Sequence, residues 1–193
     1  MTRPRAVLVA VVIGLPSPVR AQLGEVHLGA LLSYGVEEAY GAGAGIVVGV
    51  AAGRITYVGL RWTYYAGRET RVTAPTAPID VRTRVQLFAV DLGVQVPVGA
   101  FEIVPGVSVG AARFAQRARP AGAAGTDAPS VIGTEFFVAP GLSLQARLAG
   151  LVVIPEVQYG MAGDPEMPWT VAHRGLTASL RVVVPFEVGR VRR

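Results

Sequence analysis

The stretch from Thr134 to Leu148 constrains the fold most, because its two alternating sets of residues differ sharply in chemistry. In a β-strand, successive side chains point to opposite faces, so every second residue shares a face. One face of this stretch is entirely apolar, and the other carries Glu135, Gln145 and Arg147 together with Phe137 and the small residues Ala139, Gly141 and Ser143. The apolar face consists of Phe136, Val138, Pro140, Leu142, Leu144, Ala146 and Leu148. This pattern is typical of a strand that has lipid on one side and a filled polar lumen on the other.

The composition fits a membrane protein without spanning helices. The chain has 193 residues, of which 51% are hydrophobic and 16% charged, so it is too apolar for a disordered chain and long enough for one domain. A spanning helix needs about 20 consecutive apolar residues, and Gly, Arg, Asp, Glu or Gln interrupts every candidate run. Strands closed into a barrel are the remaining way to place this much apolar surface in a membrane.

The sequence contains no pattern typical of a cofactor or metal site. The chain has no Cys, which excludes disulfides, thiolate nucleophiles and Cys-ligated metals, and it has no metal-ligand spacing. The run from Gly41 to Gly49 has the glycine content of a nucleotide-binding loop, but no helical pattern follows it. Small residues that face a narrow lumen explain this run better.

Residues 1–21 have the features of a secretory signal sequence. Two arginines form a basic start, an apolar core covers residues 6–15, and residues 19–21 form a small-x-small cleavage site before Gln22. The alternative is a buried first strand or helix. Without this segment the chain keeps 15 of its 18 basic residues against 13 acidic ones, so its basicity gives little support for a nucleic-acid partner.

Eight stretches after the signal sequence alternate in polarity as the strands of a barrel do. The predicted strands are Gly24–Gly35, Ala44–Ala52, Ile55–Tyr65, Arg84–Val96, Phe101–Phe114, Thr134–Leu148, Leu151–Met161 and Gly175–Phe186. Short turns collect at one end of these strands, and long loops, predicted at 67–83, 116–133 and 162–174, collect at the other. We therefore predict an all-β fold: an eight-stranded antiparallel up-and-down transmembrane β-barrel over residues 22–186, with residues 187–193 as a short basic extension.

Four prolines and one arginine fit this register less well. Pro105, Pro140, Pro155 and Pro185 each remove one donor from the ladder of a predicted strand, which predicts bulges or lost bonds. The phase of the fifth strand would point Arg113 at lipid. Either that strand has emerged into the head groups at this point, or a bulge shifts the register.

A barrel of this size has a bore that side chains fill, so we expect a filled polar lumen and no open pore. Six charged residues on the inward faces form opposite-sign pairs at matching depths. The predicted lumen ion pairs are Arg61 with Asp91, Glu102 with Arg147, and Glu156 with Arg181. Unpaired charges would be very unfavourable in a narrow, poorly hydrated lumen, so pairing is what a closed interior requires.

The chain from Gln22 to Phe186 resembles the small eight-stranded outer-membrane barrels of the OmpA-transmembrane and OmpX type. The resemblance rests on the signal sequence, the alternation and the hairpin rhythm. Leu180, Val182, Val184 and Phe186 also resemble the carboxy-terminal assembly signal of these proteins, although residues 187–193 extend beyond it. The resemblance implies a location in the bacterial outer membrane, insertion by the barrel assembly machinery, and a monomer.

A non-enzymatic role in the cell envelope is the first functional hypothesis, because arginines gather at the long-loop end. They are Arg68, Arg71, Arg82, Arg84, Arg113, Arg117, Arg119 and Arg174. Guanidinium groups bind phosphate in a bidentate manner, so these residues are candidate contacts to lipopolysaccharide, with outer-membrane lipids as the expected partners. The alternative is that they are solvated loop charges.

Two other classes of function are considered. An enzyme acting on outer-leaflet lipids would need a Ser activated by His and an acid, and His27 and His173 are the two histidines available. Ser130 and Asp164 would reach His173 only through folding of the loops, so no catalytic residue is predicted. A soluble lipocalin-like carrier would need an apolar interior and a polar exterior, the reverse of the predicted arrangement, and Gly-x-Trp is absent near the first strand.

Overall fold

The computed structural model describes residues 23–52, 56–73, 77–122 and 130–187, and the regular elements in these residues are all β-strands. No helix among them is long and apolar enough to cross a membrane. The predicted signal sequence at 1–21 lies outside the described residues, as does all but the first residue of the extension predicted at 187–193.

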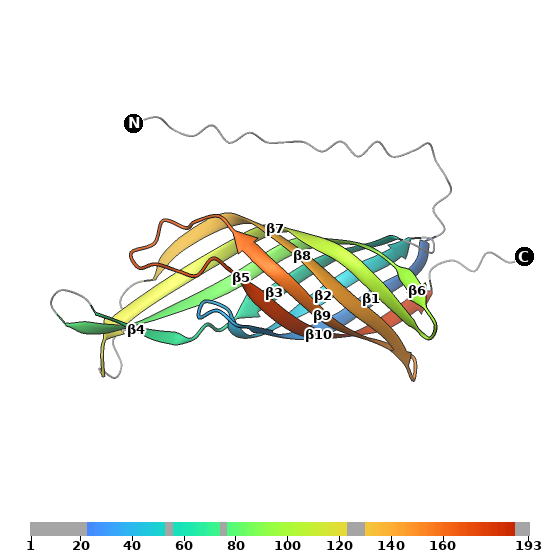
Figure 1. Ribbon diagram of the computed structural model, residues 1–193, viewed down its shortest axis with the longest axis horizontal. Coiled ribbons are helices and arrows are strands. Elements are labelled where there is room, and N and C mark those ends of the chain that lie inside the picture. The colour runs from blue at the N-terminus through green and yellow to red at the C-terminus, as the bar shows by residue number, and fades with distance from the viewer. Residues whose placement is uncertain (1–22, 53–55, 74–76, 123–129, 188–193) are drawn as a thin grey trace, which may run out of the picture.

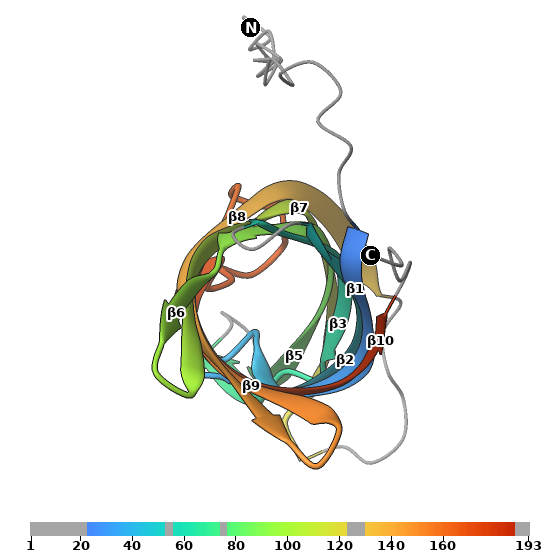
Figure 2. The ribbon, with the colours of Figure 1, turned by 90° about the vertical axis from the view of Figure 1, so that its right-hand side faces the viewer.

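The strands form one antiparallel sheet that closes on itself. They are β1 (Leu23–Gly35), β2 (Gly41–Ala52), β3 (Thr56–Tyr65), β4 (Glu69–Thr73), β5 (Pro78–Val94), β6 (Val96–Val98), β7 (Phe101–Pro120), β8 (Val131–Leu148), β9 (Leu151–Ala162) and β10 (Arg174–Glu187). Pairing of β1 with β10 and of β5 with β7 completes the ring (Figures 1 and 2). Because β4 pairs with β5 alone and β6 continues β5 beyond Gln95, the closed wall has eight strands, as predicted.

The two ends of the barrel differ in their connections. At one end, which we call the turn end, Gly99 and Gly150 adopt φ values of 63° and 84°, which suit the tight turns after β6 and β8. The other end, which we call the loop end, carries residues 36–40, the β4–β5 hairpin and residues 163–173. The β4–β5 hairpin projects from this end (Figure 1).

Exposed and buried side chains alternate along the wall strands, and the exposed set is apolar. On β3, the side chain of Leu60 is 64% exposed, whereas that of its neighbour Arg61 is 6% exposed. The same alternation continues on β5, where Val90 is exposed and Asp91 is buried. An apolar exterior around buried charges is the transmembrane arrangement. It excludes the lipocalin-like carrier, which has the opposite polarity.

The interior has an apolar core at the loop end, in addition to the polar lumen that the sequence predicts. This core contains Ala39, Tyr40, Tyr65, Val85, Leu87, Ala112, Phe114, Phe137, Ala139, Ala162 and Val171. Tyr40 reaches it from the link between β1 and β2 and packs edge-on against Tyr65, with ring centroids 5.3 Å apart. The mouth of the loop end is therefore closed by packed side chains.

The glycines of β2 leave room for tyrosine rings in the lumen. A Cβ atom on Gly43 would lie 2.6 Å from the ring of Tyr65, and one on Gly49 would lie 2.3 Å from the hydroxyl of Tyr57. Both distances are far below van der Waals contact. The run from Gly41 to Gly49 thus has the space-making role predicted for it.

Two of the four strand prolines interrupt the pairing, and none of them shifts the register. Pairing passes through Pro105 and Pro185 in continuous register. Between β8 and β9, the pairing skips the positions of Pro140 and Pro155 and resumes in the same register. Lost ladder contacts, rather than bulges, therefore accommodate these two residues.

Strands extend into two stretches that the sequence predicts as loops. β5 begins at Pro78 rather than at Arg84, and β7 ends at Pro120 rather than at Phe114. β4 also lies inside the loop predicted at 67–83. In these extensions the outward positions carry arginines instead of apolar residues, and this loss of contrast hides the alternation. β5 and β7 consequently continue beyond the apolar belt.

We expect an arginine on the outer surface to destabilise the barrel according to its depth. Leu60→Arg places a cation in the middle of the apolar belt and should lower the free energy of unfolding by about 2–4 kcal/mol, whereas Val98→Arg at the turn end should lower it by at most about 1 kcal/mol. Reversible urea unfolding in phospholipid vesicles, followed by tryptophan fluorescence, measures both values. Equal losses at the two depths would contradict the assigned belt.

Candidate functional site

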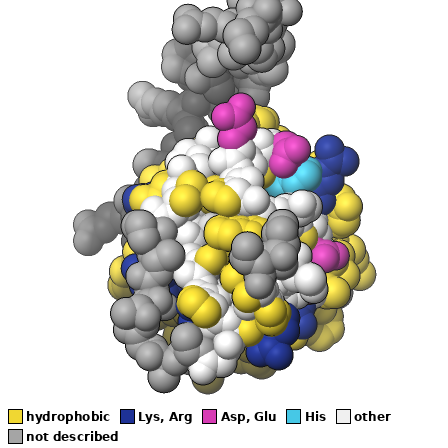
Figure 3. Space-filling model, turned by 90° about the vertical axis from the view of Figure 1, so that its left-hand side faces the viewer, with side chains coloured by type: hydrophobic (Ala, Val, Ile, Leu, Met, Phe, Trp, Pro, Cys, Tyr) yellow, Lys and Arg dark blue, Asp and Glu magenta, His cyan; other side chains and the backbone are white. Residues whose placement is uncertain are grey.

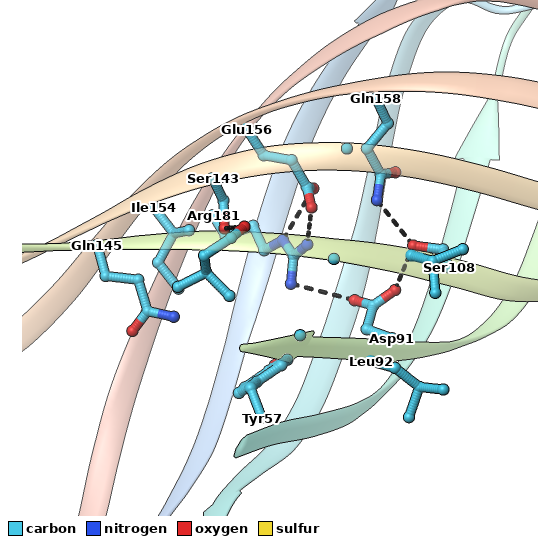
Figure 4. A pocket seen from close by; sticks show the side chains of 15 residues that line it. Tyr57, Asp91, Leu92, Ser108, Ser143, Gln145, Ile154, Glu156, Gln158 and Arg181 are labelled. Atoms are coloured by element: carbon cyan, nitrogen blue, oxygen red, sulfur yellow. Dashed lines mark hydrogen bonds and ion pairs between the residues drawn. The ribbon is translucent and has the colours of Figure 1, made fainter. Parts of the chain in front are cut away.

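Four charged side chains from four strands meet in the lumen. Arg61 of β3 donates to Asp91 Oδ2 of β5 from Nε at 3.0 Å and from Nη2 at 2.9 Å. Arg61 Nη2 also lies 2.9 Å from Glu156 Oε2 of β9. Arg181 of β10 places Nη1 3.1 Å from Asp91 Oδ2 and is ion-paired with Glu156 (Figure 4). We call these four residues the lumen charge cluster.

Neutral side chains complete the hydrogen bonding of the lumen charge cluster. Ser108 Oγ donates to Asp91 Oδ1 at 2.6 Å, and Gln158 Nε2 donates to Ser108 Oγ at 2.7 Å. Gln158 Oε1 in turn accepts from Arg61 Nη1 at 2.9 Å. The four charged side chains are only 5 or 6% exposed, so their two positive and two negative charges have to balance each other.

The space next to the lumen charge cluster is too small for a solute. A cavity of about 20 Å³ lies against Asp91, Glu156 and Arg181. This volume holds about one water molecule. The rest of the described lumen is occupied by the apolar core at the loop end and by a second buried apolar group, which consists of Leu31, Val47, Val152, Ile154 and Val183.

The structure brings together some of the predicted ion pairs and rearranges another. Arg61 contacts Asp91 and Arg181 contacts Glu156, but the four form one cluster rather than two separate pairs. The predicted partner of Arg147 is Glu102, and the ion pair found for Arg147 among the described residues is with Glu25 of β1, at 2.6 Å. Glu102 lies opposite Gln145 in the β7–β8 ladder. The prediction matched charges at similar depths, whereas closure of the ring lets the side chains of Glu25 and Arg147 meet although β10 and β9 separate their strands.

The two histidines lie at opposite ends of the barrel. His27 is buried near the turn end, where Nε2 lies 3.3 Å from Glu25 Oε2. His173 lies at the loop end, with Nδ1 3.8 Å from Asp164 Oδ1 and 3.3 Å from the Val171 carbonyl oxygen. Among the described residues, the hydrogen bonds found for these histidines involve no Ser hydroxyl. Within the same residues, no group of three or more His, Asp or Glu side chains is placed to hold a metal.

Five of the eight candidate lipopolysaccharide contacts share the outer surface of β5 and β7. These are Arg82, Arg84, Arg113, Arg117 and Arg119, which we call the arginine cluster. They occupy the same face as the exposed apolar residues of these strands but lie closer to the loop end. Basic side chains are accordingly seen toward the edge of the loop end rather than at its middle (Figure 3).

The other three candidates lie apart from the arginine cluster. Arg68 stands over the ring of Tyr34, 5.9 Å from its centroid. Arg71 of β4 lies 2.9 Å from Asp80 Oδ1 and holds the pKa of that carboxyl below its ordinary value, chiefly through the hydrogen bond. Arg174 is exposed at the start of β10.

The arginine cluster concentrates positive charge on one surface. Arg82 and Arg117 are direct partners in the β5–β7 ladder, and Arg113 is the partner of Gln86. Like charges directly opposite each other on a sheet are destabilising. Arg119 is paired with Glu69 at 2.5 Å, but no carboxylate is paired with Arg84 or Arg113 among the described residues. A depression of about 160 Å³ lies between Arg82, Arg84, Arg117 and Arg119, beside Glu69 and Asp80.

The chemistry of this surface suits phosphate. The chain has 18 arginines and no lysine, and a guanidinium group matches the oxygens of phosphate with two parallel hydrogen bonds. The sequence locates these arginines near the loop end but does not show that they share a strand face. Arg113 could have indicated this shared face, because it follows Val107 and Val109 at the alternating positions that point outward.

A closed wall, an apolar exterior and a filled lumen define the class of this protein as a small eight-stranded transmembrane β-barrel of the outer-membrane type. The major outer membrane protein of Thermus thermophilus has a similar fold, with a TM-score of 0.65 and 10% identity over 84% of this chain and 99% of that one. The N-terminal β-barrel domain of Pseudomonas aeruginosa OprF matches with a TM-score of 0.47 and 12% identity, over 84% and 98%.

Neisserial surface protein A is a further structural match, with a TM-score of 0.43 and 16% identity over 87% of this chain and 99% of that one. No protein-family model matches the sequence, and no characterised protein matches it either. At 10% identity, the match to the Thermus thermophilus protein shows a shared fold and nothing finer.

We expect the lumen charge cluster to behave as one unit in stability measurements. Arg61→Met leaves Asp91 and Glu156 with Arg181 as their shared cation in the cluster and should lower the free energy of unfolding by about 3–5 kcal/mol. Combining it with Asp91→Leu restores the charge balance and should recover most of that loss. Urea unfolding in vesicles gives the values, and a double variant as unstable as the sum of both single variants would show that the charges act independently.

Proposed function

We propose that this chain is a non-enzymatic outer-membrane β-barrel protein that stabilises the envelope by binding the phosphate groups of lipopolysaccharide in the outer leaflet. The observation that supports this most directly is the arginine cluster, which lies on the outward surface of β5 and β7 on the loop-end side of the apolar belt. The cluster stands on the wall itself, so its guanidinium groups face neighbouring lipids rather than bulk solvent.

The depth of the arginine cluster matches a head-group level. Apolar side chains on the outer face run from Phe88 on β5 to Val98 on β6. Steps of about 3.3 Å along strands tilted by about 40° make this belt roughly 25 Å tall, the height of a barrel's hydrocarbon band. Arg84 lies four residues beyond Phe88, which places it about 10 Å above the top of the belt.

Electrostatics favour an anion at this place. Arg82 and Arg117 are direct partners in the β5–β7 ladder, so an anion bound between them could accept charge-assisted hydrogen bonds from both guanidinium groups. The nearby carboxylates of Glu69 and Asp80 are already engaged by Arg119 and Arg71. A lipid phosphate is the anion available at the edge of the outer leaflet.

Other features support the location and a monomeric state. The signal sequence predicted at 1–21 would export the chain. Leu180, Val184 and Phe186 are exposed on the outer face of β10, in keeping with recognition by the barrel assembly machinery. A closed ring has no free edge along the wall for pairing with a second copy, so a monomer is proposed.

We expect the double substitution Arg84→Gln/Arg113→Gln to weaken lipopolysaccharide binding by at least about tenfold, because each lost charge-assisted contact is worth about 1.5–3 kcal/mol. Purified barrel in nonionic detergent, titrated with lipopolysaccharide in a calorimeter, gives the dissociation constants. The control is Arg68→Gln/Arg174→Gln, which removes the same charge at the same end of the barrel but outside the arginine cluster. If the two double variants bind lipopolysaccharide equally, the cluster is not the phosphate site.

A further inference from the structure

We infer that the arginine cluster is one half of a two-part lipid site, whose other half is an apolar groove directly below it that holds an acyl chain of the same lipopolysaccharide molecule. This inference rests on the proposed phosphate binding and adds a second contact to it. The ligand it identifies is the phosphorylated, acylated lipid anchor as a whole, rather than phosphate alone.

The groove lies on the lipid-facing surface of β2, β3, β5 and β7 and has a volume of about 400 Å³. It is lined by Ile46, Leu60, Trp62, Phe88, Val90 and Val109, all with apolar side chains on the outer face. In the wall register, Trp62 lies opposite Phe88, and Phe88 lies opposite Ala111 of β7. Because two large aromatic rings lie next to the single methyl group of Ala111, the surface is lower beside the rings.

The groove and the arginine cluster are continuous along two strands. Phe88 and Arg84 stand on the same face of β5, and Val109 and Arg113 stand on the same face of β7. Each pair is separated by four residues, or about 13 Å along the strand. A molecule that carries phosphate and acyl chains together can occupy both places at once, whereas a free phosphate can occupy only the upper one.

The link to the head group distinguishes this groove from the rest of the belt. Every apolar surface in a bilayer is covered by acyl chains, and exchanging one chain for another gains little hydrophobic free energy. When the arginine cluster holds a head group, the acyl chains of the same lipid molecule are kept next to the groove at a high effective concentration. The groove then selects a chain by packing, and the cluster selects the lipid by charge.

A second groove of similar size provides a matched control. It has a volume of about 360 Å³ and is lined by Leu142, Leu144, Pro155 and Val157 among others, on β8 and β9. It lies nearer the turn end and away from the arginine cluster, so a chain in it has no such anchor. Filling it should leave the affinity for the lipid unchanged.

The test uses the full barrel in nonionic detergent and native mass spectrometry, with three probes: hexa-acylated diphosphorylated lipid A, the acyl-free glucosamine disaccharide bisphosphate, and phosphatidylglycerol. Val109→Trp fills the groove, Val90→Phe fills it more mildly, and Val157→Trp fills the control groove. We expect Val109→Trp to weaken lipid A binding by at least about tenfold, equivalent to about 1.4 kcal/mol, and to leave the disaccharide bisphosphate within about twofold of the unmodified barrel.

The outcomes separate the acyl contact from the phosphate contact. A heat-modifiable shift in electrophoresis shows which variants are folded. If Val109→Trp does not fold, Val90→Phe is used in its place. If the groove variants and Val157→Trp bind lipid A equally, the acyl contact is overturned while the proposed phosphate binding stands. If lipid A binding is insensitive to Arg84→Gln/Arg113→Gln, both are overturned. Equal affinity for phosphatidylglycerol and lipid A would overturn the identification of the lipid.

Discussion

The absence of hydrogen-bonding partners in hydrocarbon is the constraint on which the rest of this structure depends. Each N–H and C=O group of a membrane-spanning strand has to find its partner in a neighbouring strand, which forces the sheet to close. Pairing of β1 with β10, and of β5 with β7, meets this requirement. Closure in turn fixes which side chains meet lipid and which are enclosed, so the polarity of both surfaces follows from it.

Closing eight strands leaves a bore that has to be filled, and this chain fills it in two ways. Aromatic and aliphatic side chains pack at the loop end, as in the core of a water-soluble protein. In the lumen charge cluster, Arg61 and Arg181 bind Asp91 and Glu156 and so join four strands of the wall. A filled interior moves the surfaces available for recognition to the outside of the barrel and to its ends.

Local periodicity predicted the fold, and long-range geometry set the limits of prediction. The alternation in Thr134–Leu148 placed the faces of β8 because a period of two residues needs no knowledge of partners. The partner of Arg147 was not predictable in this way, since Glu25 lies 122 residues away and meets it only after the ring closes. Arg82, Arg117 and Arg119 fell in predicted loops because a strand that leaves the hydrocarbon loses the contrast between its faces.

The use of arginine and never lysine throughout the chain makes the positive charge of the arginine cluster permanent. A guanidinium group does not release its proton at any pH that a cell envelope meets, whereas an ammonium group or an imidazole does so under alkaline or near-neutral conditions. Acidification or alkalinisation of the surroundings therefore titrates the lipid and the carboxylates, while the cationic side of the contact stays constant.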